Sequence, residues 1–492
     1  MSKMILNVED KPRPSQLISS VIQQILANMA ATITVPIIIG LGDHISSAIL
    51  GCGLGTLVYL LITRRKSPVL LSSNFAFIGA LILAYANCGF LGIVLGGFLS
   101  GLIYIILSIV VKFVGTGWIR KVFPPVIIGP VVALIGLSLA GTAIADLLKV
   151  ENYYYINSAG ATIYPYNLVG LACGLVTFFV VVICAVQRRN RAISMVPFLF
   201  GVAAGYSLAL ILTLIGNATH NTYIQVIDFS PVIDNFKEIS FKSFISLPKL
   251  SLVEGIMEIT NKSVKLSAFG ILEIALSFIP ISLVGFTEHI ADHKNLSNII
   301  ERDLINKEPG LSRTLLGDGL GSITGTWFGI CPNTTYGESV SCIAITRNAS
   351  TWTILVTAIS CIVLSFLTPL IVAFRTIPSC VVGGMCLALF GYIAVSGIKM
   401  LQEVDFNDDK NIFTLSIILV AGIGALSLKI PYQLGVLEGT DFYGVVKWIE
   451  ITSIAFALIL GIVTYAIASG IQKLNKKHKT NTPIENEDEE TS

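Results

Sequence analysis

The sequence predicts an all-α polytopic membrane protein, and three observations carry that prediction. Of the 492 residues, 54% are hydrophobic and only 13% are charged, whereas a soluble domain carries about 25% charged residues. Apolar stretches about 20 residues long, the length of a helix that crosses the hydrocarbon core, recur along the chain. Lysine and arginine gather in alternate breaks between these stretches, as they do where loops alternate between the two sides of a membrane.

Fourteen membrane-crossing segments can be marked off between polar breaks. The first seven cover residues 17–40, 46–63, 69–86, 89–111, 124–147, 166–186 and 193–215. The second seven cover residues 269–290, 314–329, 332–346, 352–374, 377–398, 412–428 and 448–471. Polar residues, glycine or proline interrupt the third and tenth segments, so we expect a short extended stretch in each of them.

The distribution of charge orients these segments. Basic clusters such as Arg64 to Lys66 and Arg188 to Arg191 fall on the same side as the N-terminal arm, residues 1–16. Because cytoplasmic loops collect lysine and arginine, both termini are predicted to be cytoplasmic in a multi-pass protein of the cell membrane. The arm lacks the apolar core of a signal peptide, and the charged tail, residues 473–492, is predicted to be disordered.

An internal repeat divides the chain into two halves. The run PPVIIG at residues 124–129 recurs as PSCVVG at residues 378–383, and the same offset places the first segment on the eighth. Because seven is an odd number, the second half would enter the membrane from the opposite side, which predicts two inverted repeats of seven segments. Transporters built in this way bind substrate near the midplane, between interrupted segments of the two halves. Here these interruptions are SSNF at residues 72–75 and PNTTYGE at residues 332–338.

Ionisable residues lie close to these segments, where a charge costs about 3 kcal/mol or more and therefore indicates function. Glu288, His289 and Asp292 stand at the end of the eighth segment, and Glu338 follows the break in the tenth. Two interpretations stay open for Asp292: a site residue, or a helix cap in the cytoplasmic loop, to which we also assign His293. Two stay open for His289: a site residue, or one half of a helix–helix hydrogen bond.

Other polar residues in the segments are assigned structural roles. Glu273, Asp318 and Glu450 lie near segment ends or glycine-rich contacts, and we expect them to stabilise packing. The nine cysteines include no CxxC pair, and the HExxH order of many zinc sites is absent. We therefore predict no metal and no cofactor, and we find no nucleophile–base pair that would predict an enzyme.

Two carboxylates that face a site lined by helix N-termini suit a neutral, planar solute. The carboxylates accept hydrogen bonds from ring N–H groups, and backbone amides donate to the carbonyl oxygens of the solute. A carboxyl group can also take up and release a proton, which is what coupling to a proton gradient requires. The residues alone therefore predict a carrier for such a solute.

At these positions the sequence resembles the uracil/xanthine permeases, a family also called nucleobase–cation symporters or nucleobase–ascorbate transporters, and in particular the bacterial uracil permeases. The resemblance extends over about residues 17–471. It rests on ATITVP at residues 31–36, SNFAF at 73–77, Glu288 and His289 with Pro280 before them, PNTTYGE at 332–338 and AITR at 344–347.

The resemblance implies a division of the fourteen segments into two domains. Segments 1–4 and 8–11, residues 17–113 and 268–375, would form a core domain. Segments 5–7 and 12–14, residues 114–215 and 376–472, would form a gate domain through which two copies dimerise. Residues 216–267 would form an external loop between the halves.

The resemblance also implies roles for individual residues. Substrate binding would involve Glu288, Glu338, the backbones of Phe75 and Gly337, and the residues Tyr336 and Ala31. Proton coupling would involve Glu288, Asp292, Glu338 and His289. Asp292 stands where the family pattern has a histidine associated with coupling, and Ser339-Val340-Ser341 stands where it has Asn-x-Gly, a stretch that influences substrate choice.

We therefore predict an importer of uracil together with a proton, with xanthine or another purine as the alternative substrate. An anion transporter of the same fold is a remote alternative, because Glu288 and Glu338 would repel an anion. Expected partners are a nucleobase, a proton, the lipid bilayer and a second copy of the chain. Nucleic acid is not expected, because the net charge of +2 is not concentrated in a basic patch.

Overall fold

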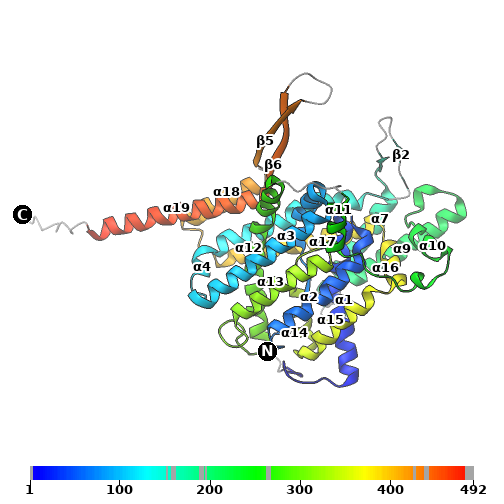
Figure 1. Ribbon diagram of the computed structural model, residues 1–492, viewed down its shortest axis with the longest axis horizontal. Coiled ribbons are helices and arrows are strands. Elements are labelled where there is room, and N and C mark those ends of the chain that lie inside the picture. Colours follow the sequence, from blue (N-terminus) through cyan, green and yellow to red (C-terminus); the bar gives the residue numbers. More distant parts are fainter. Residues whose placement is uncertain are drawn as a thin grey trace, which may run out of the picture.

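The computed structural model describes residues 4–150, 153, 155–156, 162–187, 193, 197–261, 268–424, 428–436 and 443–481, and most of them are helical (Figure 1). In the first half the helices are α1 (Pro14–Ile38), α2 (Ile45–Ile62), α3 (Ile78–Val114), α4 (Ile119–Val122), α5 (Pro125–Ser138), α6 (Ala140–Leu147), α7 (Leu168–Val186) and α9 (Pro197–Thr219). Two short helices follow, α10 (Ser230–Lys237) and α11 (Ser251–Thr260). In the second half they are α12 (Ala268–Ile299), α13 (Leu311–Phe328), α14 (Gly337–Thr346), α15 (Thr351–Ser365), α16 (Thr368–Arg375), α17 (Ser379–Met400), α18 (Asp409–Ile423) and α19 (Ser453–Asn481).

Within the part of the chain that the structure describes, short strands form three antiparallel pairs. Strand β1 (Leu71–Ser73) pairs with β4 (Asn333–Thr335), and these are the extended stretches that the sequence predicts in the third and tenth segments. Strand β2 (Tyr155–Ile156) pairs with β3 (Thr162–Ile163), and β5 (Leu428–Val436) pairs with β6 (Tyr443–Ile451). Short 3-10 turns complete the chain, among them η2 (Phe75–Phe77), which joins β1 to α3.

Membrane-crossing capacity is confirmed for much of the chain. Among the described residues, nine helical stretches are long and apolar enough to cross a bilayer. One of them, Phe75–Val114, contains the fourth predicted segment and residues 75–86 of the third. The ninth, tenth, eleventh and thirteenth segments correspond to shorter or more polar helices, α13, α14, α15 and α18. The count of fourteen therefore stays a prediction.

The fourth segment is separated from the third by a kink at Gly89. Its backbone has φ 57° and ψ −149° inside α3, a conformation that glycine adopts without the cost that a Cβ imposes. The N–H of Leu91 beyond the kink donates to Glu258 Oε2 of α11 at 3.2 Å. The carboxylate of Glu258 therefore caps the helix where it restarts, and it joins the loop before α12 to α3.

The repeated proline runs occupy equivalent structural positions. Pro124 is the N-cap of α5 with φ −70° and ψ 155°, and Pro378 is the N-cap of α17 with φ −67° and ψ 149°. The two helices pack together, and a Cβ on Gly129 would stand 2.8 Å from the carbonyl oxygen of Gly397. This equivalence supports the predicted repeat, whose inversion stays a prediction.

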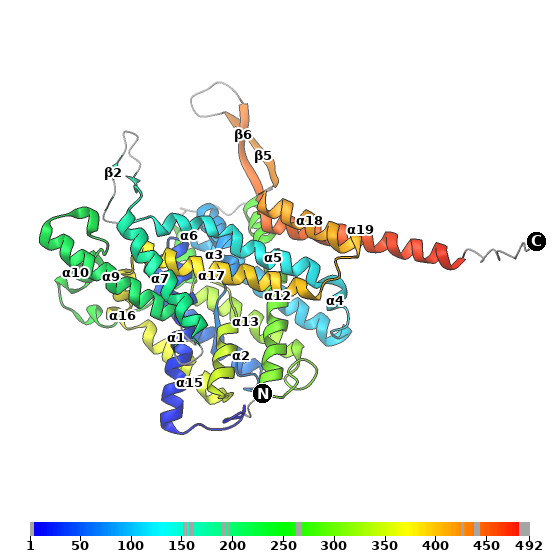
Figure 2. The same ribbon diagram turned by 180° about the vertical axis from the view of Figure 1, so that it is seen from behind.

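The long helices pack into two sets. In the first set α13 lies along α2 and α3, with α1, α12, α14 and α15 around them, and in the second α17 lies along α5, α6 and α7 beside α9, α18 and α19 (Figure 2). Within the first set a Cβ on Gly51 would stand 2.5 Å from the carbonyl oxygen of Gly325. Such glycines let helices approach closely, which is how helices associate in lipid. Contacts between the sets are sparse and run mainly from α1 to α9 and from α12 to α5 and α19.

Two predicted segment ends are wrong. The helix of the eighth segment continues beyond residue 290 to Ile299, because His293 packs against Tyr59 of α2 instead of entering a loop. The fourteenth segment begins at Ser453, because residues 448–451 belong to β6. That strand is rich in β-branched and aromatic residues, which favour extended backbone. Figure 1 shows the β5–β6 hairpin projecting away from the helices.

Gly89→Ala should lower the stability of the protein by about 1–3 kcal/mol, because alanine is strained at this φ and its methyl group would meet Glu258. Gly79→Ala is a matched control on the same helix, since a Cβ there meets nothing within 4 Å. Thermal unfolding of the purified variants in detergent measures the difference. A Gly89→Ala protein as stable as the wild type would contradict this account of the kink.

Candidate functional site

The antiparallel pair of strands β1 and β4, which we call the β1–β4 crossing, brings the two interrupted segments together inside the first helix set. Its register pairs Leu71 with Thr335, Ser72 with Thr334 and Ser73 with Asn333. The N–H of Leu71 donates to Thr56 Oγ1 of α2 at 3.0 Å, while Ser322 of α13 donates to the carbonyl oxygen of Asn333 at 2.7 Å. The extended backbone is thus satisfied by its partner strand and by hydroxyl groups of the flanking helices, as apolar surroundings require.

A helix begins directly after each strand. Asn74 caps η2 by accepting a hydrogen bond from the N–H of Ala76 at 2.8 Å, and α3 follows. Tyr336 is the N-cap of α14, whose first residues are Gly337 and Glu338. The first N–H groups of a helix have no partner within it. Both helix starts therefore present donors beside the crossing.

A cavity of about 270 Å³ lies against these helix starts. Its polar wall is built by β1, η2, β4, the start of α14 and one face of α12. Its other wall comes from the second helix set and is mostly apolar, with Val132 and Ile135 from α5 and Leu389, Tyr392, Ile393, Ser396 and Met400 from α17. The cavity is thus placed between the two helix sets.

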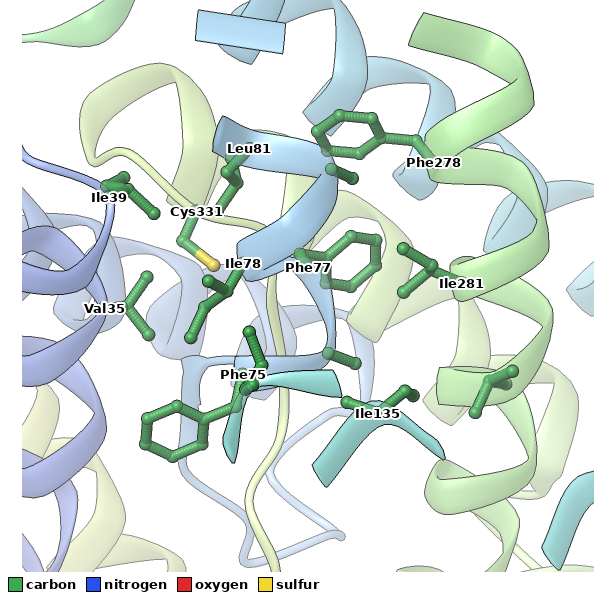
Figure 3. Packing of buried hydrophobic residues seen from close by; sticks show 14 of the residues in the cluster. Val35, Ile39, Phe75, Phe77, Ile78, Leu81, Ile135, Phe278, Ile281 and Cys331 are labelled. Atoms are coloured by element: carbon green, nitrogen blue, oxygen red, sulfur yellow. The ribbon is translucent and has the colours of Figure 1, made fainter. Parts of the chain in front are cut away.

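Close packing fixes the floor of this cavity. In Figure 3, Phe75 lies beside Ile135 of α5, while Phe77 faces Phe278 and Ile281 of α12. The rings of Phe77 and Phe278 are stacked with centroids 5.7 Å apart. These apolar contacts hold η2 in place, so the Phe75 backbone has a defined position at the cavity.

Three half-buried carboxylates line the cavity: Glu288, Asp292 and Glu338. Asn74 Nδ2 donates to Glu288 Oε2 at 3.3 Å and to Thr334 Oγ1 at 2.9 Å, which links α12 to both strands. Asp292 Oδ1 lies 3.2 Å from the point where a Cβ on residue 337 would stand, so Gly337 leaves room for this carboxylate. No lysine or arginine is among the described residues that line the cavity. The site is strongly acidic.

The structure brings together most of the residues expected at the site. Glu288, Asp292, Glu338, Phe75, Tyr336 and Gly337 all line the cavity. Ala31 does not: it is fully buried on α1, in the same apolar cluster as Phe75 and Tyr336. Asp292 belongs to α12, not to a loop. The assignment of His293 to a loop is wrong, because His293 is fully buried in α12.

His289 and His293 lie on the other face of α12. His289 Nδ1 bonds Asp318 Oδ2 at 2.6 Å and His289 Nε2 bonds Thr314 Oγ1 at 3.0 Å, both on α13. This confirms the expected helix–helix hydrogen bond of His289 and the structural contact of Asp318. His293 Nδ1 donates to the carbonyl oxygen of His289 at 2.9 Å, so its Nε2 is free to accept from Tyr59 of α2 at 2.8 Å.

Sequence reasoning missed the cavity residues of α17. Tyr392 and Ser396 lie in an ordinary apolar segment, and no local pattern marks them. Ser72 and Ser73, by contrast, stand in the interrupted run that the sequence singled out. Their hydroxyl groups are buried and form no hydrogen bond within the described chain.

Comparison with known proteins gives consistent relatives. The model of a permease family, Xan_ur_permease, matches residues 15–429. The chain is 32% identical over 472 residues to the uracil permease of Bacillus caldolyticus, covering 96% of both chains. It is 33% identical to that of Bacillus subtilis (strain 168) and 34% identical to that of Escherichia coli (strain K12), covering in each case 87% of this chain and 90% of the relative.

Solved structures with a similar fold are membrane transporters. The transmembrane domain of the cyanobacterial bicarbonate transporter BicA aligns with a TM-score of 0.51 and 11% identity, covering 94% of this chain and 99% of that one. The murine anion transporter Slc26a9 in its inward-facing state aligns with a TM-score of 0.58 and 9% identity, covering 94% and 69%. At this identity the likeness concerns the fold alone.

The buried pair of His289 and Asp318 gives a prediction about stability. Asp318→Ala should cost about 1–3 kcal/mol, because it leaves His289 buried without its partner. In the Asp318→Ala background, His289→Leu should lower the free energy of unfolding by less than it does in the wild-type protein. The effects of substitutions at two residues that bond each other are not additive. Unfolding of the two single variants and the double variant in a denaturing-detergent titration measures the coupling.

The matched control for that cycle is the surface pair of Lys66 and Glu308, in which the hydrogen bond from Lys66 lowers the pKa of the Glu308 carboxyl group. Ion pairs in such half-exposed positions contribute little to stability. Strictly additive costs for Asp318→Ala and His289→Leu would show that the buried contact does not couple α12 to α13.

Proposed function

The chain belongs to the Xan_ur_permease family of permeases, and on that premise we propose that it imports uracil together with a proton. It is a multi-pass membrane transporter and not an enzyme, because the relatives that it matches over nearly its whole length are permeases. The observation that carries the proposal is the acidic cavity at the β1–β4 crossing, in which carboxylates and helix N-termini lie side by side.

The chemistry of uracil matches this cavity. Its ring carries two N–H donors and two carbonyl acceptors in one plane. Glu288 and Glu338 would accept from the ring N–H groups, and the backbone N–H groups at Phe75 and Gly337 would donate to the carbonyl oxygens. Tyr336 would order the start of α14, and Ala31 would contribute its small size to the packing behind Phe75 and Tyr336.

Proton coupling would arise because several carboxylates lie close together in the acidic cavity. Glu288, Asp292 and Glu338 share one cavity, and like charges in a partly desolvated site repel each other strongly. A proton shared among them relieves this repulsion, so loading and release of the proton can accompany loading and release of the base. His289 would take part through α12, where it stands next to Glu288 and is held by Asp318.

The two helix sets would act as the core and gate domains. The cavity lies between them, and their mutual contacts are sparse, so one set can move past the other while the packing within each is kept. Figure 1 shows the N-terminus on the side opposite the β5–β6 hairpin. Cytoplasmic termini remain part of the proposal. A dimer through the second set remains part of the proposal.

The alternative substrate is xanthine or another purine. It is kept because Ser339, Val340 and Ser341, at the start of α14, depart from the Asn-x-Gly of the family pattern. Transport of an anion is disfavoured, although BicA and Slc26a9 share the fold. Three carboxylates line the cavity and no described lysine or arginine balances them.

Glu288→Gln should nearly abolish uracil binding while the protein stays folded. The substitution keeps the shape of the side chain but removes a charge-assisted contact worth about 1.5–3 kcal/mol, or tenfold to a hundredfold in affinity. Asp292→Asn is the matched control on the same helix face and should impair transport more than binding. Calorimetry on purified protein measures both affinities. Binding by Glu288→Gln within about threefold of wild type would exclude Glu288 as the recognising carboxylate.

Uptake of radiolabelled uracil by permease-deficient cells should fall as the external pH rises, because each imported base needs a proton from outside. It should collapse when an uncoupler removes the proton gradient. Competition with unlabelled xanthine in the same assay distinguishes the two substrates. Uptake that depends on sodium and ignores pH would overturn proton coupling while leaving the assignment to the family untouched.

A further inference from the structure

A second, larger cavity separates the two helix sets beside the acidic one. Its volume is about 790 Å³. One wall belongs to the first set and includes Ala27 of α1 and Ile345 of α14, and the other belongs to the second set and includes Val182 of α7, Phe198 of α9 and Gly391 of α17. We call this space the lateral groove. It shares two residues, Glu338 and Tyr392, with the acidic cavity.

The lining of the lateral groove is almost wholly apolar. Besides Glu338 and Tyr392, Ser341 is the other residue of the described lining that carries a hydroxyl or charged group. Ordered water needs several polar partners and does not fill a space of this kind. An empty gap of this size would lose the dispersion contacts that an apolar occupant supplies to its walls. The groove therefore calls for an apolar occupant.

The groove is continuous with surface that faces lipid. Val182 and Val186 on its α7 wall are 40% and 71% exposed. The spans formed by α7 and α9 are only 33% and 22% buried within the chain, among the lowest of the candidate spans. Exposed apolar spans in a membrane protein are solvated by acyl chains. The same chains have direct access to the groove.

Basic residues stand near the ends of the groove-lining helices. Arg347 follows directly on α14 and forms no ion pair with a carboxylate of the described chain. Arg188, Arg189 and Arg191 follow Val186 in the sequence, and their structure lies outside the described residues. In the predicted topology both positions are cytoplasmic. A phosphate group of the inner leaflet is the natural partner of such arginines.

We propose that the lateral groove binds one acyl chain of a phospholipid from the cytoplasmic leaflet, with its phosphate at Arg347. The chain lies between the two helix sets and reaches the residues behind the acidic cavity, Glu338 and Tyr392. Because its walls belong to different sets, the groove changes shape when the sets move relative to each other. The lipid is then a ligand of one arrangement of the sets, and it biases their equilibrium by its preference for that arrangement.

The test uses the full chain reconstituted in nanodiscs that contain phosphatidylglycerol with a photoreactive diazirine near the end of one acyl chain. After irradiation and digestion, mass spectrometry maps the labelled peptides. We expect label on both walls of the groove, on α14 around Ile345 and on α17 around Gly391. Label confined to the outward faces of α7 and α9 would overturn the proposal, whatever any variant does.

Gly391→Leu sharpens this test, because a Cβ at Gly391 meets nothing within 4 Å and a leucine there projects into the groove without a clash. It should reduce labelling of α14 at least about fivefold, since a filled groove excludes the chain sterically. Gly141→Leu, at an exposed position of α6, is the matched control, with equally free space around its Cβ, and should leave labelling unchanged. Equal labelling of Gly391→Leu and wild type would refute binding in the groove.

Arg347→Gln tests the phosphate contact separately. It removes the cation and leaves a shorter, neutral polar side chain, so labelling on both walls should fall severalfold at limiting lipid. Phosphatidylglycerol and a diazirine-labelled fatty alcohol serve as paired probes, because only the first carries a phosphate. Loss of labelling with Arg347→Gln for phosphatidylglycerol and not for the alcohol supports the proposed orientation. Equal labelling of this variant and wild type with phosphatidylglycerol would refute the contact.

Discussion

In hydrocarbon every backbone N–H and C=O must form a hydrogen bond within the protein. At the β1–β4 crossing the backbone is extended, so these bonds come from strand pairing and from side chains and not from a helix. The two strands pair with each other and with hydroxyl groups of α2 and α13. Once the backbone of the crossing is hydrogen-bonded, a helix can begin after each strand. The first N–H groups of these two helices, which have no partner within their helix, lie at the same cavity. The cavity therefore follows from how the extended backbone is accommodated.

The acidic face of α12 completes that cavity, and contacts on its other face hold it there. Glu288 and Asp292 point toward the crossing, while His289 and His293 one position later along the helix bond to α13 and α2. Fully bonded polar side chains in low-dielectric surroundings fix one arrangement, because any shift would leave a buried group without a partner. The proposed recognition on one face thus depends on hydrogen bonding on the neighbouring face.

Composition and local pattern predicted the membrane class, the two extended stretches and the cavity carboxylates Glu288 and Glu338, since each of these violates what lipid tolerates in an ordinary helix. For Asp292 they left open a site residue or a helix cap. The sequence does not mark a cavity residue that lies in an ordinary apolar membrane helix. Tyr392 and Ser396 lie in an unremarkable apolar helix, and only tertiary packing brings α17 to the cavity. The end of α12 was misplaced because His293 looks like a loop residue until Tyr59 is known to lie beside it. Residues 448–451 of β6 were assigned to the fourteenth segment because they adjoin the apolar run of that membrane span.

The account is tested most directly by an experimental structure of the protein with uracil bound. It should place the base at the β1–β4 crossing, with ring N–H groups within hydrogen-bonding distance of Glu288 and Glu338 and a carbonyl oxygen facing the N-terminus of α14. The base found away from the crossing, for example in the pocket lined by His44 and Arg375, would contradict the claim that the crossing and the acidic face of α12 form the site.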